Sequence, residues 1–323
     1  MSGKTPKTIF TDKDAAMPKA ILHVMPSTYH RLCTWHTMQN ALKHVNGVFR
    51  GEVKNVLSGF FYEIEDESDF LMAWNHMLDE YNVHENTWLK SIFDLKEKWV
   101  YPYVRHAWSA GMKSTQLSES FNATLKEYLK SDLNVSQLFM HFERVVNDKR
   151  YKELEAEYDL LYRLVNVKLN AKMSIQAREV FTKAIFLEFQ HEFKQDVELN
   201  MNCTTNGGNI IYSVNMDFAS KERHVKMDSD NTLSCSCRMF KMKGALCSHV
   251  IKILRDALNI KEIPTQYILK RWTKQSRVKC VQDMHGCEIQ EDPKLQQTYR
   301  YRSFVLSSLE YLVEFRRVKK PIF

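Results

Sequence analysis

Four residues with metal-binding side chains lie close together in the last third of the chain: Cys235, Cys237, Cys247 and His249. Thiolate and imidazole groups are preferred zinc ligands, and two close pairs joined by a loop suit one tetrahedral site. Because protein side chains fill every position, the pattern predicts a closed structural site, in which Zn²⁺ contributes folding free energy rather than catalysis. The alternative is a set of buried thiols beside a surface histidine.

The other cysteines do not extend this pattern. Cys203, Cys280 and Cys287 have no partners at metal-binding spacing, so we expect free thiols. Seven cysteines spread over 323 residues do not indicate a disulfide framework, and the amino terminus has no apolar signal sequence. These features predict a reducing compartment, and the lack of a long apolar run predicts no membrane span.

The cysteine and histidine spacing resembles a known module. The segment from Cys235 to Val250 reads CSCRMFKMKGALCSHV. It resembles the SWIM zinc finger, which occurs in Mutator-like transposases and their relatives. The resemblance implies the same structural Zn²⁺ site, with one ion held by the four side chains.

A second group of candidate residues is acidic. Asp12 and Asp14 flank the end of a β-prone run, and Glu119 lies far downstream on a predicted helix. Carboxylates projecting from a strand end and a nearby helix could hold the two divalent ions of a nuclease or transposase. Spacing alone favours simpler roles, in which Asp14 caps the following helix, Asp12 ends a turn and Glu119 is a surface residue.

Several longer segments resemble one family. They are residues 10–17, 30–36, 114–122 and 266–274. They resemble the Mutator-like transposase domain, and in particular the FAR1/FHY3 (FAR1-related sequence) family of transposase-derived transcription regulators in plants. The resemblance spans most of residues 1 to 275 and implies a nuclear regulator of transcription, often in light-responsive development.

The resemblance also assigns residues one by one. Asp12 falls at the second catalytic acid of the transposases and Glu119 at the third, while Cys33 and His36 match their Cys-x-x-His motif. The first catalytic aspartate of the family lies upstream of the segment that begins here, as does an amino-terminal zinc-binding domain. We therefore expect Asp12 and Glu119 to be vestigial and predict that the chain is not an enzyme. Two candidate ligands, Cys33 and His36, do not make a second zinc site.

Hydrophobic periodicity predicts an α+β fold that is mostly helical. Strand, helix, strand and helix alternate near the amino terminus, which favours a layered core with some parallel pairing. The family resemblance implies that this core is part of a ribonuclease H-like domain. Aromatic residues then recur at helical spacing and are expected to fill a core. The predicted parts are a partial transposase domain (1–130) with a helical insert (about 50–110), a helical connector (131–199), a β-rich module of ββα type (200–260) containing the zinc finger (235–249), and a basic tail (261–323).

The net charge of +7 is unevenly distributed. Residues 1–220 contain 25 Lys and Arg against 28 Asp and Glu, whereas residues 221–323 contain 21 against 11. A basic region of this kind suits DNA phosphates or acidic partners. Candidate contact residues are Lys241, Lys243, Arg271, Lys274 and Arg277.

The sequence leaves three functions open. The favoured one is a nuclear regulator that contacts DNA, nuclear proteins or both, with possible homo- or hetero-dimers among family members and no small-molecule substrate. The second is a Mutator-like transposase seen as an incomplete chain, in which Asp12 and Glu119 bind Mg²⁺ or Mn²⁺. The third is a SWIM-mediated protein-interaction module that does not bind DNA.

Overall fold

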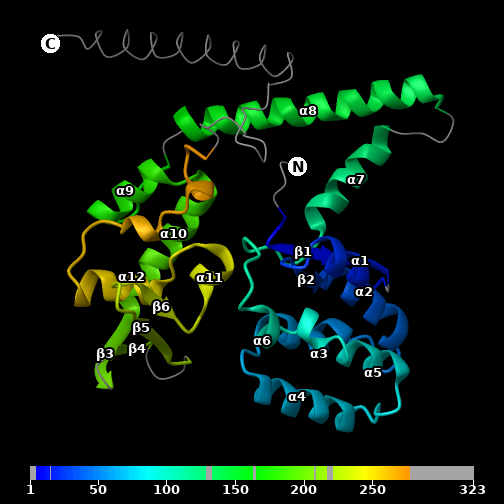
Figure 1. The fold of residues 1–323 in the computed structure, drawn as a ribbon, viewed down its shortest axis with the longest axis horizontal. Helices are drawn as coiled ribbons and strands as arrows, with labels where there is room; N and C mark the ends of the chain where they lie inside the picture. The colour runs from blue at the N-terminus through cyan, green and yellow to red at the C-terminus, as the bar shows by residue number, and fades with distance from the viewer. Residues whose placement is uncertain are drawn as a thin grey trace. The chain divides into compact units, whose positions relative to one another are not determined.

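The computed structural model describes residues 5–14, 16–128, 133–162, 165–206, 209–216 and 221–276. All of them fall in one compact unit, Thr5–Ser276. The fold mixes helices with two small sheets, as expected for an α+β protein (Figure 1). No helix in the described ranges is long and apolar enough to cross a membrane.

The amino-terminal region (residues 5–113) opens with a parallel strand pair. Strand β1 (Thr8–Thr11) pairs with β2 (Tyr29–Leu32), and helices α1 (Ala16–Val24) and α2 (Thr34–Val45) follow the two strands. The Asp14 carboxylate accepts hydrogen bonds from the N–H groups of Ala16 and Met17, at 2.7 and 3.1 Å. Asp14 therefore caps α1. The predicted order of elements and the parallel pairing are confirmed, whereas the ribonuclease H-like core stays a prediction.

Helices α3 (Val53–Tyr62), α4 (Glu67–Glu80), α5 (Thr87–Phe93) and α6 (Tyr101–Val104) form the helical insert. Their aromatic side chains fill its core, as predicted: Phe60, Phe70, Trp74 and Trp99 are at most 3% exposed. The Phe60 and Phe70 rings meet edge to face at 5.5 Å. The Trp99 indole donates to the carbonyl of Ile92 at 2.9 Å, so its polar atom is satisfied inside the core.

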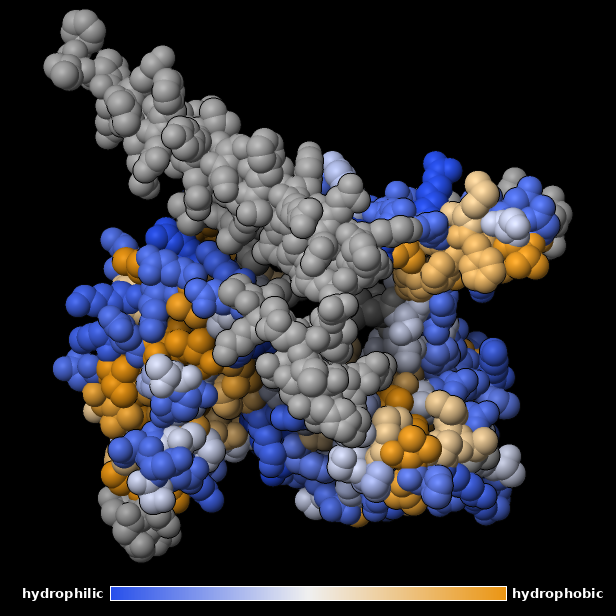
Figure 2. All heavy atoms as spheres, turned by 45° about the horizontal axis from the view of Figure 1, so that its top comes forward, coloured by the Kyte–Doolittle hydropathy of each residue, from blue (hydrophilic) through white to orange (hydrophobic). Residues whose placement is uncertain are grey.

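Two helices follow the insert. Helix α7 (Gln116–Tyr128) begins just after Ser114 and Thr115, and α8 (Val135–Tyr162) is the longest helix in the described residues. The first turns of α8 carry exposed apolar side chains, and Figure 2 shows an apolar area at this end of the helix. These side chains are Val135, Leu138, Phe139, Met140 and Phe142.

The carboxyl-terminal module (residues 172–276) packs helices on an antiparallel sheet. The sheet order is β3 (Leu199–Asn206), β4 (Asn209–Met216), β5 (Arg223–Met227) and β6 (Leu233–Cys235). Helices α9 (Lys172–Val180) and α10 (Lys183–Gln195) precede it, and α11 (Met239–Lys243) and α12 (Ser248–Lys252) follow it. A π-type turn, Ile253–Ala257, extends α12.

The predicted boundaries of this module are too narrow. Helices α9 and α10 were assigned to a connector, yet Phe186 and Phe193 of α10 lie in one core with Val214 and Ile251. The sheet has four strands rather than the two of a ββα unit, because the polar strands β3 and β4 pair along their full length.

The predicted tail also begins too early. Ile263 and Tyr267 are buried, and the Trp272 indole donates to the carbonyl of Lys243 at 2.8 Å. These apolar side chains hold residues 261–276 on the module although the surrounding sequence is basic. Residues 277–323, with the rest of the predicted tail, lie outside the described residues.

A buried ion cluster joins the amino-terminal region to the module. The Glu65 carboxylate accepts hydrogen bonds from both terminal nitrogens of Arg223, one of them at 2.7 Å, and lies 3.0 Å from Arg105 and 3.5 Å from Lys221. The Glu65 and Arg105 side chains are only 11% and 7% exposed. Burial alone would raise the pKa of Glu65, but the Arg223 hydrogen bond and the three positive charges lower it below its ordinary value.

A tight turn adds an apolar contact between the same two parts. Gly244 ends α11 with a φ of +77°. A Cβ at this position would clash with Leu269 and lie 2.8 Å from the Trp108 ring. Glycine is therefore required at position 244 for two reasons: its left-handed backbone conformation and the close approach of the Leu269 and Trp108 side chains.

We predict that Glu65→Gln destabilises the protein by about 3 kcal/mol, because three cations lose a buried counter-charge. The matched control is Glu85→Gln, which removes the exposed partner of Lys90 and should leave the stability nearly unchanged, because water screens an exposed ion pair. Urea unfolding at pH 7 measures both. Since the pKa of Glu65 is lower in the folded state, its contribution is present at neutral pH and is lost as the pH falls through that folded value. Equal effects of the two variants would contradict the cluster.

We predict that Gly244→Ala also destabilises the protein, by at least about 2 kcal/mol, because it combines left-handed backbone strain with overpacking against Trp108. Gly59→Ala is the control: Gly59 lies within α3, where a Cβ meets nothing within 4 Å, so alanine should raise stability by up to about 1 kcal/mol. Thermal unfolding followed by circular dichroism distinguishes the two. A neutral Gly244→Ala would mean that α11 does not end in this geometry.

Candidate metal centre

The two cysteines of the first pair lie where β6 ends. Cys235 is the last residue of β6, and the chain turns at Arg238, whose φ is 59° and whose N–H donates to the Cys235 carbonyl at 3.0 Å. The Cys237 N–H donates to the Cys235 sulfur at 3.4 Å. This tight turn, which we call the knuckle (residues 235–238), brings both thiols to the same side of the chain.

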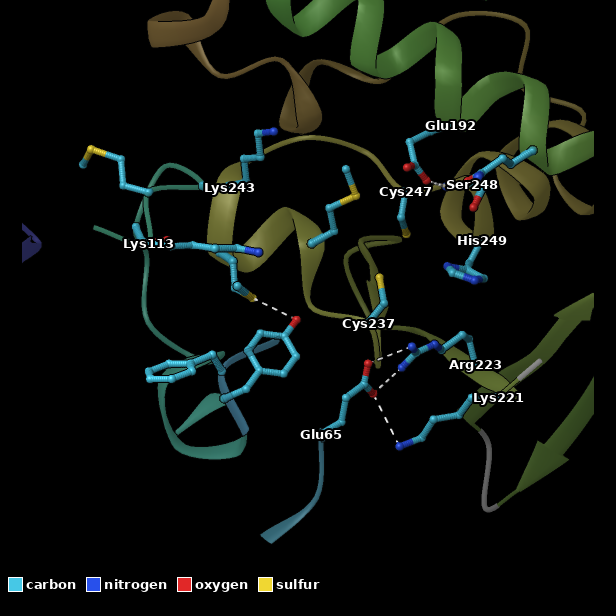
Figure 3. Close-up of a pocket in the computed structure, with 18 of the residues that line it drawn as sticks. Glu65, Lys113, Glu192, Lys221, Arg223, Cys237, Lys243, Cys247, Ser248 and His249 are labelled. Carbon is cyan, nitrogen blue, oxygen red and sulfur yellow. Dashed lines mark hydrogen bonds and ion pairs between the residues drawn. The ribbon is translucent and has the colours of Figure 1, made fainter. Parts of the chain in front are cut away.

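The second pair lies at the start of α12. Cys247 is the residue before the helix and His249 lies in its first turn. The Glu192 carboxylate of α10 accepts the Ser248 N–H at 2.8 Å and satisfies one of the free donors at the helix start. Figure 3 shows the side chains of Cys237, Cys247 and His249 gathered around a common space.

The four predicted zinc ligands come together. One ligand atom from each of Cys235, Cys237, Cys247 and His249 lies within 4.8 Å of all the others. Sulfur ligands of a tetrahedral zinc ion lie roughly 3.8 Å apart, so a small inward movement completes the site. Cys247 is buried and its three companions are partly buried. The cluster is consistent with one zinc site.

Hydrogen bonding within the cluster separates the thiol pKa values. Hydrogen bonds from Cys235 and Cys247 lower the pKa of Cys237 far below its ordinary value. The same hydrogen bonds raise the pKa values of the thiols that donate them. The hydrogen bond to Cys237 raises the pKa of Cys235 to about 12. Hydrogen bonds to Cys235 and Cys237, together with burial, raise the pKa of Cys247. Without a cation, these hydrogen bonds favour the thiolate form of Cys237 and the thiol forms of Cys235 and Cys247. A divalent cation displaces the remaining protons, because only thiolates coordinate it.

The donor set also fits a metal on the histidine side. The Nδ1 atom of His249 is buried and has no hydrogen-bond partner in the part of the chain that the structure describes. A buried polar atom in this state is costly. Coordination of a cation by that nitrogen would satisfy it, so the cluster offers three soft sulfur ligands and one imidazole to a zinc ion.

Two flanking elements fix the knuckle. Ser236 pairs with β5, since its N–H donates to the His224 carbonyl at 2.9 Å. On the other side, Arg105 of the amino-terminal region donates to the Ser236 carbonyl at 2.6 Å, and Arg105 is itself held by Glu65. The Glu65 cluster thus reaches the backbone between two zinc ligands. Sequence patterns gave no signal for this contact, because its members lie more than a hundred residues apart.

The acidic candidates are placed differently. Asp12 is exposed just after β1, and Glu119 lies in the first turn of α7. Within the described ranges, the Cys235 group is the only set of at least three His, Cys, Asp or Glu side chains close enough to hold a metal. Neither acid joins such a group.

The Cys-x-x-His motif instead meets the start of α7. The Cys33 sulfur accepts the Thr115 N–H at 3.3 Å, and His36 lies 3.8 Å from the Glu119 carboxylate. The resemblance segments around residues 33 and 119, far apart in sequence, are therefore neighbours in the fold. They link α2 to α7.

The basic residues predicted to contact DNA or a partner lie in different surroundings. Lys241 is exposed, whereas Lys243 is partly buried and forms an ion pair with Glu188. Arg271 is exposed and stacks on the Trp108 and Trp272 rings, at 5.3 and 4.8 Å. The Lys274 backbone donates to Val180 at 2.9 Å. Arg277 lies outside the described residues.

Comparison with known families agrees with these motifs. A family model of the MULE transposase domain matches residues 1–40, and one of the SWIM zinc finger matches residues 212–257. The second match contains the four clustered side chains. No solved structure matches the chain.

Curated relatives match over most of the chain. Protein FAR1-RELATED SEQUENCE 5 of Arabidopsis thaliana is 30% identical over 94% of this chain and 39% of its own length. Protein FAR1-RELATED SEQUENCE 1 is 29% identical over 96% of this chain and 45% of its own length, and Protein FAR-RED IMPAIRED RESPONSE 1 is 26% identical over 86% and 34%. The chain thus spans less than half the length of these relatives. Its resemblance to the FAR1-related family is confirmed: over most of its length it is homologous to FAR1-related sequence proteins of Arabidopsis, and it carries a MULE transposase segment and a SWIM zinc finger.

Proposed function

We propose that the chain is a nuclear, transposase-derived transcription regulator whose SWIM finger holds a structural zinc ion. The clustered Cys235, Cys237, Cys247 and His249 carry this proposal, together with the FAR1-related homology. Zinc would tie the knuckle to α12 and supply folding free energy. The name of one relative refers to an impaired far-red response, which supports a role in light-responsive development.

The zinc finger would present a basic surface. Arg238 at the knuckle and Lys241 in α11 are exposed side chains of the segment between the two ligand pairs. Burial, and after it the charges of Lys241 and Arg238, lower the pKa of His106, so both cations lie near this histidine. Arg271 adds a third exposed cation, stiffened by its two indole neighbours. We propose that Arg238, Lys241 and Arg271 contact DNA phosphates or an acidic partner.

The other predicted contact residues rank lower. Lys243 is paired with Glu188, and Lys274 is partly buried, with its backbone N–H donated to the Val180 carbonyl at the end of α9. The homology to FAR1-related proteins favours a regulator over a transposase, so Asp12 and Glu119 are proposed to have no catalytic role. A ribonuclease H-like origin of β1, β2 and their helices, and dimers among family members, belong to the same proposal.

We predict about one zinc per purified chain by elemental analysis. Cys247→Ala should lose the metal and the cooperative unfolding of the carboxyl-terminal module, because the remaining ligands bind zinc weakly and the knuckle loses its anchor. Cys203→Ala, at an exposed free thiol of β3, is the matched control and should keep both. A folded protein without zinc, or equal metal content in the two variants, would remove the finger from the proposal.

We predict salt-dependent binding to duplex DNA, since phosphate contacts release counterions. Lys241→Gln and Arg271→Gln should each weaken binding at all sequences and lower the slope of log Kd against log salt by about 1. Lys90→Gln is the control, because Lys90 is an exposed cation in the helical insert. Fluorescence anisotropy from 50 to 200 mM salt provides the measurement. Binding that is absent, independent of salt, or equally weakened by the control would contradict the phosphate surface and favour a partner protein.

A further inference from the structure

A pocket of about 520 Å³ lies between the amino-terminal region and the zinc finger. Arg31, Ser109 and Lys113 line it, together with Lys243 and the ligands Cys237, Cys247 and His249. Figure 3 shows Lys113 and Lys243 across the pocket from His249 and Arg223. This volume is typical of pockets that take small molecules.

The pocket contains a buried cation, Arg31, for which the described residues supply no counter-charge. Arg31 is 3% exposed, and its Nε and Nη1 atoms are buried with no hydrogen-bond partner among the described residues. Its guanidinium lies over the Phe10 ring at 4.9 Å, which is a cation–π contact rather than an ion pair. A buried arginine is normally paired with an acid. Arg31 therefore retains hydrogen-bond donors for a group that the protein itself does not supply.

A buried hydroxyl that lines the same pocket, that of Ser109, also lacks a hydrogen-bond partner among the described residues. Ser109 is 2% exposed, and its Oγ is buried without a partner in the described part of the chain. The Ser109 backbone is fixed, since its N–H donates to the Met242 carbonyl at 2.9 Å. The hydroxyl is thus held in the pocket wall with free hydrogen-bonding capacity.

The acids that line the pocket are already committed. Glu65 pairs with Arg105, Arg223 and Lys221, and the Glu192 carboxylate accepts the Ser248 N–H. Lys243 pairs with Glu188. Among the residues that the structure describes, no acid pairs with Arg31 or Lys113, and the Lys113 ammonium contacts the Tyr62 ring at 4.4 Å. The pKa of Lys113 is lowered by burial and by the charges of Arg31 and Lys243, so these three cations act on one space.

We propose that this pocket binds the phosphate group of a small phosphorylated molecule, with Arg31, Ser109 and Lys113 as its donors. A guanidinium fork and a hydroxyl suit the several acceptor oxygens of a phosphate, and an ammonium adds charge at the pocket mouth. The phosphate satisfies the buried nitrogens of Arg31 and the Ser109 hydroxyl together. The pocket would bind this molecule as a ligand, without making or breaking a covalent bond in it. Because the site is a pocket lined by both parts of the chain, the ligand would also hold the zinc finger against the amino-terminal region.

The first experiment measures thermal stability and calorimetric binding of the zinc-loaded full chain. Inorganic phosphate and glucose 6-phosphate are compared with sodium chloride at equal ionic strength. We expect both phosphates to raise the Tm with a saturable dependence that chloride does not give. Tighter binding of the ester identifies a phosphorylated metabolite as the ligand, and tighter binding of the free ion identifies inorganic phosphate. No saturable effect of either would overturn the proposal.

Variants locate the binding. Lys113→Gln and Ser109→Ala should each raise the Kd about tenfold, which is the loss of one charged or hydroxyl donor. Lys90→Gln is the matched control and should bind as the wild type. Arg31→Gln should abolish binding, and circular dichroism checks its fold; if it does not fold, the other two variants decide. Unchanged phosphate affinity of both Lys113→Gln and Ser109→Ala would show that the anion does not bind in the pocket. If duplex DNA displaces the phosphate and Lys241→Gln weakens phosphate binding, the anion binds instead at the outer basic surface.

Discussion

The buried carboxylate of Glu65 is the charge on which the arrangement of the two parts depends. It is the shared counter-ion of Arg105 and Arg223, which come from different parts of the chain, and each would otherwise be a poorly hydrated cation. Removing such charges from water is costly, and the buried cluster is stable only when each buried charge has its partners. Removing Glu65 leaves the two arginines without their counter-charge. The amino-terminal region and the module therefore fit in one arrangement, because a shifted interface would strand charges in a low-dielectric space.

The same cluster positions the knuckle. Arg105 uses one nitrogen for Glu65 and another for the carbonyl of Ser236, so the backbone between two zinc ligands is fixed by a side chain more than a hundred residues away. From the module side, β5 fixes the same residue through His224. Metal ligands commonly require such outer contacts to hold their geometry. Here the outer contacts belong to both parts of the fold.

The sequence predicted what depends on short spacing. The four ligands were found because their side chains lie within fifteen positions, and zinc chemistry restricts which residues can occupy them. The Asp14 cap and the strand pair were likewise local. Glu65 was not predicted, because an acid in a helical insert gives no sign that Arg223 will reach it. Arg31 lies in the resemblance segment 30–36 but was not predicted as a binding residue, since a buried cation without a partner among the described residues is recognised only from its surroundings.

The module boundaries show a related limit. A change from helical to alternating periodicity near residue 200 marks where the strands begin, but the core extends from α9 to Tyr267. Periodicity reports the local element, whereas a domain is defined by which apolar faces meet.

Folding of the knuckle is linked to formation of the contact between the module and the amino-terminal region. The Ser236 carbonyl accepts the Arg105 hydrogen bond only when the turn from Cys235 to Arg238 has formed, and that turn depends on its ligands being held together. A metal ion that stabilises the turn therefore stabilises the contact with the amino-terminal region by mass action, even though the metal touches no residue of that region.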